Sequence, residues 1–347
     1  MSHYTKKDIM RLVEEEDVEF IRLQFTDLFG NLKNAAVTAS QLEKVLDNRY
    51  VFDGSCVEGF LHDNDMDMFL CPDLDTLAIF PWRPQQGKVA RLICDIQKRD
   101  GSPYEGDSRY ILQKVLKEAE GLGYRFDVGP ECEFFLFHTD DDGNPTVFSH
   151  EKAGYFDMSP IDQGENVRRD IILTLEEMGF EVESSYHEVA FAQHEIDFRY
   201  DEALLSADNI MTFKLAVKTI AKRFGMHATF MPKPRAGING SSMHTNISLK
   251  KDGKNVFADE NDEYGLSQEA YWFIGGLMKH ARGLQGHQVR GRPGGFRHGR
   301  IHLCPGSLVE DRLLRDSLRK PRQQQALLLP AGRRGHPLRD RSLHEVH

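Results

Sequence analysis

The chain has 347 residues, of which 40% are apolar and 28% charged, a composition typical of a soluble globular protein with about two domains. Its net charge of −10 argues against nonspecific binding of nucleic acid, no apolar run is long enough for a membrane helix, and the N-terminus MSHYTKKDIM lacks the apolar core of a signal peptide. The cysteines are scattered, odd in number and never in a CxxC pair, which predicts reduced thiols and a cytoplasmic protein; they are Cys56, Cys71, Cys94, Cys132 and Cys304.

The N-terminal third reads as a small sheet-rich domain. Thr5 can cap a helix that runs to about Glu16, with Ile9, Leu12 and Val13 on one face. Short strands and turns follow as far as residue 100, among them EFIRLQF and the buried-type VARLICDI. The polar run at 98–107 is a plausible linker, so we predict a first domain over residues 1–103.

The next segment alternates strands and helices. Helices are expected near 109–123, 167–179, 209–225 and 269–281. Strands are expected in VGPECEFFLF, HEVAFAQHEIDF, HATFMPKP and SSMHTNISL. This order predicts a catalytic-type α/β or α+β domain over residues 104–281, with several antiparallel strands.

The composition changes after Ala281. From Arg282 onward the chain holds 13 Arg and one Lys against five acids, a net charge of +9, which leaves −19 for the first 281 residues. The same segment holds six of the 15 histidines and a single aromatic residue, Phe296. Few large apolar residues are available to offset chain entropy, so we expect a basic tail over 282–347 that is poorly ordered.

Two carboxylates share one face of the strand VGPECEFFLF. Side chains alternate along a strand, so Glu131 and Glu133 point the same way, roughly 7 Å apart. Phe135 and Phe137 continue this face in apolar form. Glutamate is seldom buried unless it is paired or bound to a cation. The alternative is a solvent-facing edge, which the pair alone does not exclude.

Two other strands carry matching groups. Glu188 and Glu195 are seven residues apart, so a bulge or turn near residues 190–193 is needed if both serve one site. Another strand places His244, Asn246 and Ser248 on one face. Carboxylates with one imidazole suit Mg²⁺ or Mn²⁺, so the three strands together predict a metal site. The competing interpretation is a set of unrelated surface acids.

Two glycine turns are candidates for substrate contact. Asn239-Gly240 allows backbone amides to approach a carboxylate, and Asp53 precedes Gly54 in a tight turn. Either turn can also be purely structural. The chain has no GxxxxGK[ST] or GxGxxG motif, so any nucleotide must bind outside those two schemes.

Several long stretches, in order across residues 5–281, resemble bacterial type I glutamine synthetase: FDGSCVEGF, GPECEFFLF, HEVAFAQHEIDF, FMPKPRAGINGSSMHTNISL and YWFIGGLMKHA. The resemblance implies an α+β fold, with a β-grasp-like N-terminal domain and a catalytic domain whose antiparallel strands form a funnel. It implies a dodecamer of two hexameric rings, with active sites between neighbouring subunits. The implied reaction joins glutamate and ammonia using ATP, through a γ-glutamyl phosphate.

The same resemblance implies roles for individual residues. One Mg²⁺ or Mn²⁺ ion would be held by Glu131, Glu188 and Glu195, and a second, which bridges the nucleotide phosphates, by Glu133 and His244. The remaining positions would contact substrates: Glu183, Asn246 and Ser248 the ATP, Asn239 and Gly240 the glutamate, and Asp53 the ammonium of a neighbouring subunit, whose proton it would take.

The chain departs from the family pattern at several points. Tyr186 replaces the first histidine of His-His-Glu-Val, Phe191-Ala192 replaces Pro-Gly or a similar pair, and Ser242 replaces a usual glycine. After Ala281 the expected N-R-S-x-x-R-x-P and T-R-x-E-x-R segments are absent, and with them substrate-binding arginines and a third ligand for the second metal. A reading-frame shift near codon 282 is our hypothesis for this tail.

Two alternatives to glutamine formation remain open from the sequence. One is a γ-glutamyl ligase for an amine larger than ammonia, although the Asp53 motif favours ammonia. The other is a noncatalytic member of the family, which the changed tail favours.

Overall fold

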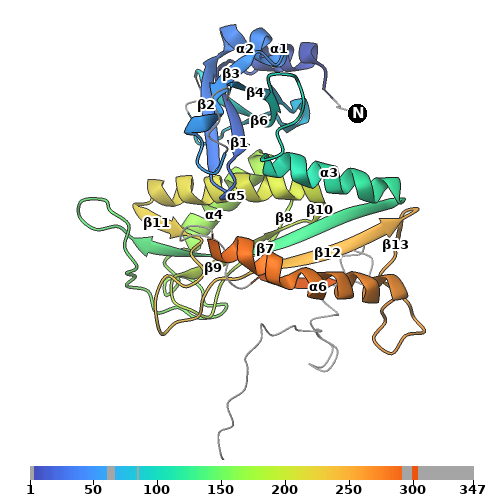
Figure 1. The fold of residues 1–347 in the computed structure, drawn as a ribbon. Coiled ribbons are helices and arrows are strands. Elements are labelled where there is room, and N and C mark those ends of the chain that lie inside the picture. Colours follow the sequence, from blue (N-terminus) through green and yellow to red (C-terminus); the bar gives the residue numbers. More distant parts are fainter. Residues whose placement is uncertain (1–3, 61–66, 84–85, 291–298, 304–347) are drawn as a thin grey trace, which may run out of the picture. The chain divides into compact units, whose positions relative to one another are not determined.

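The structure is a computed structural model that describes residues 4–60, 67–83, 86–290 and 299–303, with backbone alone beyond residue 281 (Figure 1). Most of the predicted basic tail, residues 291–298 and 304–347, lies outside the described residues. Two sheets organise the described chain. None of the described helices is both long and apolar enough to cross a bilayer.

The first sheet has six strands in the order β2-β1-β6-β4-β3, with β5 beside β6. Its strands are β1 (Val18–Thr26), β2 (Leu32–Thr38), β3 (Tyr50–Asp53), β4 (Asp67–Pro72), β5 (Ala78–Ile79) and β6 (Lys88–Lys98). The short helix α2 (Leu42–Leu46) follows β2. Helix α1 (Lys6–Glu15) begins at Thr5, whose side chain forms a capping box with Asp8. The buried Ile9 and Val13 of α1 join the apolar core of this sheet, as their spacing predicts.

The second sheet has eight strands in the order β13-β12-β7-β9-β8, with β10 and β11 beside β7 and β14 beside β12. Its strands are β7 (Tyr124–His138), β8 (Val182–His187), β9 (Gln193–Phe198), β10 (Asp201–Glu202), β11 (Met226–Thr229), β12 (Met243–Lys251), β13 (Lys254–Asn255) and β14 (Gly299–Leu303). The 15-residue strand β7 pairs antiparallel with β9, β10, β11 and β12, which confirms the expected antiparallel architecture.

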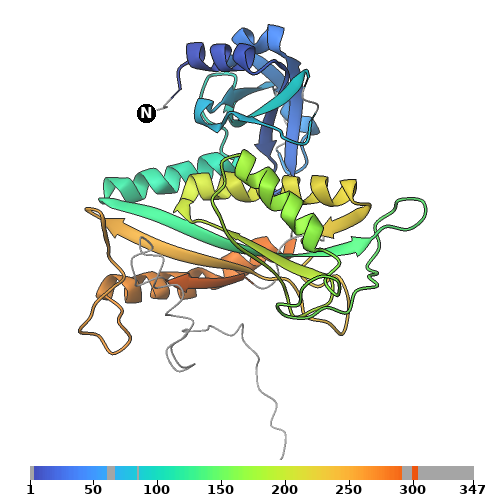
Figure 2. The same ribbon diagram turned by 180° about the vertical axis from the view of Figure 1, so that it is seen from behind.

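The four long helices of the second half are α3 (Ser108–Gly121), α4 (Glu165–Glu177), α5 (Ala203–Arg223) and α6 (Gln268–Arg290). Figure 2 shows α3, α4 and α5 running along the second sheet. Cys132, Phe134 and Leu136 of β7 point into one core with buried residues of α4 and α5. Since side chains alternate, Glu131 and Glu133 lie on the opposite face of β7. There Phe135 and Phe137 stack with ring centroids 5.3 Å apart.

Two elements run past the change in composition at residue 282. Helix α6 continues to Arg290, and β14 pairs in parallel with β12. Upstream, α6 packs through Ala270 and Phe273 near Ile247 of β12. The N-terminal and catalytic segments also share contacts, because Phe80, Trp82 and Val89 belong to the core of the second sheet.

Candidate active site

Strand register sets acidic side chains directly opposite one another on one face of the second sheet. Between β7 and β9, Glu133 is opposite Glu195 and Glu131 is opposite Asp197. On the other side of β7, His244 of β12 is opposite Glu131. Residues directly opposite in a ladder share a face, and like charges in that position destabilise a sheet. The fold therefore gathers carboxylates at a cost that only a compensating group can offset.

Burial increases that cost. Glu195 is 4% exposed and Glu133 is 9% exposed. Burial raises the pKa of Glu195, and the charges of Asp197, Glu133 and Glu188 raise it further. The pKa of Glu133 is also raised by burial, with Glu188 adding to the shift against hydrogen bonds from Ser242. Three of the predicted metal ligands are thus close enough to disturb one another's ionisation.

A tight turn brings Glu188 to this face. Strand β8 ends at His187 and β9 begins at Gln193, so the break in alternation that the spacing requires is present. The backbone N–H of Glu188 donates to the carbonyl of Gln193 (2.8 Å) and closes the turn. Ala192 adopts a φ of +61° within it.

Glu133 accepts hydrogen bonds from two neighbours that the sequence did not single out as site residues. Gln193 Nε2 donates to Glu133 Oε2 (2.6 Å) and also to the carbonyl of Gly240 (3.1 Å). Ser242 Oγ donates to Glu133 Oε1 (2.5 Å). The Asn239-Gly240 turn therefore lies beside the carboxylates. Gly240 cannot carry a side chain, because a Cβ would collide with the carbonyl of Pro232.

Glu131 lies between two side chains of β12. Asn246 Nδ2 donates to Glu131 Oε1 (2.7 Å), and His244 Nδ1 is 3.3 Å from Glu131 Oε2. Both contacts follow from the β7–β12 register. The predicted alternation of His244 and Asn246 on one face is therefore confirmed by their shared partner.

Three predicted residues stand apart from this cluster. Ser248 is fully buried and its hydroxyl has no hydrogen-bond partner in the described structure. Glu183 is exposed at the register shift between Val182 and Ser184. Burial is the largest cause of the raised pKa of Asp197, and the charge of Glu183 adds to the rise. Asp53 belongs to the first sheet, at the end of β3.

Asp53 has its own local structure. Its Oδ1 accepts from the backbone N–H (2.9 Å) and hydroxyl (2.6 Å) of Ser55. These bonds, led by the hydroxyl, hold the pKa of Asp53 below its usual value, so the exposed carboxylate is ionised at neutral pH. Gly54 packs so closely on Met68 that a Cβ would lie 2.7 Å from its sulfur. This contact excludes a larger residue at position 54, directly after the exposed Asp53.

Asp197 and Tyr186 are site residues that the sequence reasoning missed. Asp197 follows Glu195 by two positions, so simple alternation would have placed it on the carboxylate face. Burial raises its pKa, while Ser184 Oγ, 2.5 Å from Asp197 Oδ2, opposes that shift. Tyr186 is opposite Glu195 in the β8–β9 ladder, and its side chain opposes the rise in the pKa of that carboxyl. Only the register reveals this second residue.

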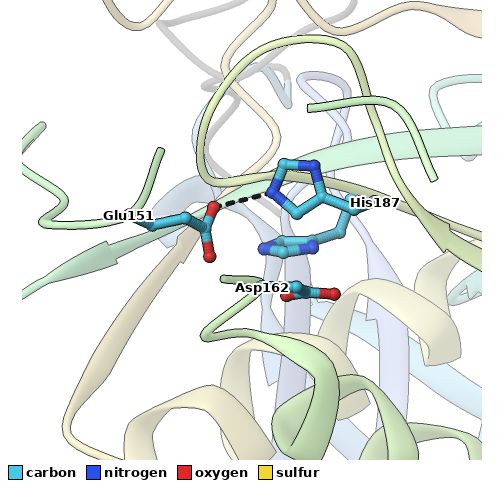
Figure 3. A group of neighbouring side chains, drawn as sticks. Glu151, Asp162 and His187 are labelled. Atoms are coloured by element: carbon cyan, nitrogen blue, oxygen red, sulfur yellow. Dashed lines mark hydrogen bonds and ion pairs between the residues drawn. The ribbon is translucent and has the colours of Figure 1, made fainter. Parts of the chain in front are cut away.

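A separate group of acids and histidines lies behind the same turn. Glu151, Asp162, His187 and His194 are all buried, with possible ligand atoms within 4.8 Å of one another (Figure 3). His187 and His194 are directly opposite in the β8–β9 ladder, on the face away from Glu195. Each histidine directly precedes a predicted metal ligand, Glu188 or Glu195.

Most possible ligand atoms of this buried group are already engaged, with His194 Nε2 the exception among the described atoms. His187 bonds through Nδ1 to the carbonyl of Glu188 and through Nε2 to Glu151 Oε1, both at 2.7 Å. Burial alone would lower the pKa of His187, but the Glu151 carboxylate raises it overall. Arg168 pairs with Asp162 (2.7 Å) and donates to His194 Nδ1 (2.9 Å). The Arg168 guanidinium and the His187 ring thus face the carboxylates of Asp162 and Glu151, and these contacts brace the turn.

The carboxylate face, in contrast, suits a divalent cation. It offers oxygen donors with one imidazole, the ligand set that Mg²⁺ and Mn²⁺ prefer. The residues that would hold the ions are Glu131, Glu133, Glu188, Glu195 and His244. Positive charge between β7 and β9 would relieve the repulsion that raises the pKa values of the opposed acids.

Comparison with known families gives two matches. A model of the glutamine synthetase catalytic domain matches residues 105–286, and one of the glutamine synthetase beta-Grasp domain matches residues 17–99. The chain belongs to the glutamine synthetase family. A glutamine synthetase of Clostridium saccharobutylicum is 62% identical over 284 residues, and one of Staphylococcus aureus is 58% identical over 282. These matches cover 82% and 81% of the chain but only 64% and 63% of the relatives.

Solved structures agree on the glutamine synthetase fold. A GmaS/ADP complex superimposes with a TM-score of 0.74 at 32% identity, covering 80% of this chain and 64% of that one. A Plasmodium falciparum glutamine synthetase gives a TM-score of 0.74 at 27% identity, covering 82% and 62%. The β-grasp and catalytic domains expected from the sequence are therefore present, and the chain spans less than two thirds of the relatives' length.

Proposed function

We propose that the chain carries the metal and substrate face of an ATP-dependent glutamate–ammonia ligase that works through a γ-glutamyl phosphate. The observation that carries the proposal is the register of β7 with β9, which sets Glu133 against Glu195 and Glu131 against Asp197. Such a face is unfavourable without bound cations. Two divalent ions would supply charge neutralisation for phosphoryl transfer.

The proposed ligands divide between two ions, and the register favours another division than the one that the resemblance implies. Glu133 lies opposite Glu195 and close to Glu188, so these three would hold one ion. Glu131 lies opposite His244, with His244 Nδ1 3.3 Å from Glu131 Oε2, so these two would hold the other. The Asn239-Gly240 turn, joined to Glu133 through Gln193 and the Gly240 carbonyl, would place glutamate beside the first ion.

A cavity beside the carboxylate face suits the nucleotide. It measures about 770 Å³ and includes Tyr200 and Lys250 in its lining, with Lys250 Nζ 5.6 Å from the Tyr200 ring centroid. Gly129 packs between Tyr200 of this lining and Asn246 of the face, because a Cβ there would lie 3.0 Å from Tyr200 Cβ and 3.8 Å from Asn246 Cβ. We propose that ATP lies here, with Asn246, which donates to Glu131, between it and the metal ions; Glu183 and Ser248 lie outside the lining of this cavity. The GmaS structure is a complex with ADP.

Asp53 would complete the site from a neighbouring subunit. Its carboxylate is exposed and held ionised by Ser55, so it can bind an ammonium ion and take a proton from it. Since Asp53 lies on the first sheet, this role requires assembly, and we propose a homo-oligomer of the dodecameric kind. We also propose that the protein is cytoplasmic and that the boundary between its two domains lies near residue 103.

The test is an assay of the purified chain with glutamate, ATP and Mg²⁺, with and without ammonium. Phosphate release that depends on ammonium is the expected result. The changed composition after Ala281 favours one rival, a noncatalytic family member. That rival predicts no phosphate release with ammonium or with larger amines, while Mg²⁺ still raises the melting temperature.

A further inference from the structure

Arg109, near the start of α3, donates hydrogen bonds to acids of both domains. Its Nε (3.1 Å) and Nη2 (3.0 Å) donate to Asp208 of α5, within the residues that match the catalytic domain. Its Nη1 donates to Asp95 of β6 (2.5 Å) and its Nη2 to Asp73 (2.6 Å), both within the β-grasp domain. The Arg109 side chain is 9% exposed. One nearly buried guanidinium therefore joins three carboxylates across the boundary between the domains.

A second guanidinium lies at the same boundary but bonds to none of these acids. Arg91 and Asp95 lie on one face of β6, together with Val89, which belongs to the core of the second sheet. Arg91 is 6% exposed, and its Nε and Nη1 have no hydrogen-bond partner among the described residues. Arg91 therefore contributes charge to the boundary, whereas Arg109 contributes directional bonds.

The form of the Arg109 contact favours one orientation of the domains. A guanidinium is planar and presents its donors in fixed directions, so it bonds well to several carboxylates in only one arrangement. Apolar contacts allow more sliding, because the hydrophobic effect is non-directional. Asp208 holds Arg109 from the catalytic side and leaves Nη1 and one Nη2 proton for the β-grasp side. Gln113, one turn further along α3, adds a bond to the same Asp95 (3.1 Å).

The two β-grasp acids hold the strands that carry Asp53. Asp73 directly follows β4, and Asp95 of β6 is opposite Cys71 of β4. Strand β4 pairs with β3, in which Asp53 is opposite Asp67. Asp73 comes six positions after Asp67, which is about 20 Å along an extended strand. A tilt of about 5° at the boundary would therefore move Asp53 by roughly 2 Å over that length.

We propose that Arg109 is a positioning residue, which fixes the orientation of the β-grasp domain on the catalytic domain and so places Asp53 for the neighbouring subunit. The inference rests on the proposed function, which assigns the ammonium of that subunit to Asp53. A misplacement of about 1 Å can slow a reaction by about 100-fold, so a small tilt is enough to matter. Bonds that only stabilised the fold would have no selective effect on the use of ammonium.

The first experiment measures the distance between the turn after Asp53 and the catalytic domain. Cys56 is exposed and the other described cysteines are buried, so Cys56 takes one spin label, and Lys222→Cys at the exposed end of α5 takes the other. Cys304→Ser removes the remaining cysteine, and excess unlabelled chain keeps the measured pairs within one subunit. Pulsed electron paramagnetic resonance should give one narrow distance, which Arg109→Gln should broaden or shift by about 2 Å. An unchanged distance distribution overturns the proposal.

Arg11→Gln is the control for this measurement. Arg11 pairs with Asp8 and Glu15 around its own helix and joins no two domains, so its loss should leave the distance unchanged. Arg109→Lys keeps the charge without the planar fork and should give an intermediate result; a lysine variant that behaves as the unsubstituted chain contradicts the directional role. Far-UV circular dichroism checks folding, and Asp95→Asn, which weakens the β-grasp side alone, replaces Arg109→Gln if that variant does not fold.

Steady-state kinetics of the unlabelled chain give the second readout. Arg109→Gln should raise the KM for ammonium by about 10-fold and leave the KM values for ATP and glutamate within about 2-fold. Equal changes in all three values overturn the positioning role. If the unsubstituted chain shows no ammonium-dependent phosphate release, the proposed function fails, and the distance measurement still decides whether Arg109 fixes the domains.

Discussion

At the scale of single residues, Ala192 occupies a backbone conformation that glycine prefers. Its φ is +61°, and its N–H donates to the buried Glu151 carboxylate in the turn between β8 and β9. A left-handed conformation costs a residue with a Cβ about 1–2 kcal/mol. The turn has to take this form, because Glu188 and Glu195 reach one face only through it.

Replacing Ala192 with glycine should therefore be nearly neutral for stability. Relief of the left-handed strain offsets the lost burial of one methyl group, about 0.8 kcal/mol, and the added backbone entropy of glycine. Ala190 is a matched control, since it is buried in the same apolar cluster without a positive φ. Chemical denaturation should show Ala190→Gly to be more destabilising than Ala192→Gly by about 1 kcal/mol. Equal losses would contradict the strain at Ala192.

At the scale of elements, strands β7 and β9 place four acids in register. Burial and mutual repulsion raise the pKa values of Glu133, Glu195 and Asp197. Groups with raised pKa values bind more protons in the folded state than in the unfolded state at intermediate pH. The free energy of unfolding of the cation-free protein must then fall as pH rises above the ordinary carboxyl range.

We expect the melting temperature of the cation-free chain to fall between pH 5.5 and 8, and saturating Mg²⁺ to reduce that fall. Glu195→Gln should stabilise the cation-free chain at pH 8 by about 1–2 kcal/mol and weaken the effect of Mg²⁺. Thermal unfolding across pH measures both effects. His187, with its raised pKa, gives a slope of the same sign, but it remains in the Glu195→Gln variant and so serves as an internal reference. If saturating Mg²⁺ leaves the pH dependence of the melting temperature of the unsubstituted chain unchanged, the argument is refuted.

A second element-scale feature supports the same strands from behind. The ion pairs of His187 with Glu151 and of Arg168 with Asp162 fix the ends of β8 and β9 against α4. His194 is kept neutral, since burial and the nearby Arg168 lower its pKa. The ring of His194 lies so close to Gly164 that a Cβ there would be 2.6 Å from Nε2. Tight packing on this side holds the carboxylates in position on the other.

At the scale of the whole molecule, the similarity to the family ends at nearly the same place as the amino-acid composition changes. The match to the catalytic-domain model ends at residue 286, and the arginine-rich composition begins at Arg282. The chain spans 64% of its Clostridium relative. These observations agree with the hypothesis of a frameshift. Loss of sequence similarity alone would not distinguish a frameshift from a different natural tail.

Sequencing the gene around codon 282 tests that hypothesis. We expect a single-base insertion or deletion whose correction restores the N-R-S-x-x-R-x-P and T-R-x-E-x-R motifs. The segment GHPLRD at 335–340 permits codons that, read from the second base, encode Asp-Thr-Arg-Tyr-Glu-Ile. If no single-base change recovers both motifs, the tail is the natural sequence and the frameshift is wrong.

The sequence by itself determined the family, the antiparallel architecture and most of the carboxylate face. Alternation along β7 and β12 is a local property of the chain, so it placed Glu131 with Glu133 and His244 with Asn246. Long motifs identified the family for the same reason, because they are contiguous in the chain.

Only the tertiary structure decided which residues of different strands face one another. Strand register is set by long-range pairing, and a shift by one residue would reverse every side chain. The opposition of Glu131 to Asp197, that of Tyr186 to Glu195 and the contact of Ser242 with both Glu133 and His244 all depend on it. The same holds for the buried ion pairs behind the turn, which join residues up to 36 positions apart in the sequence. Local patterns determine which face a side chain takes, whereas packing and pairing across the fold determine its partner.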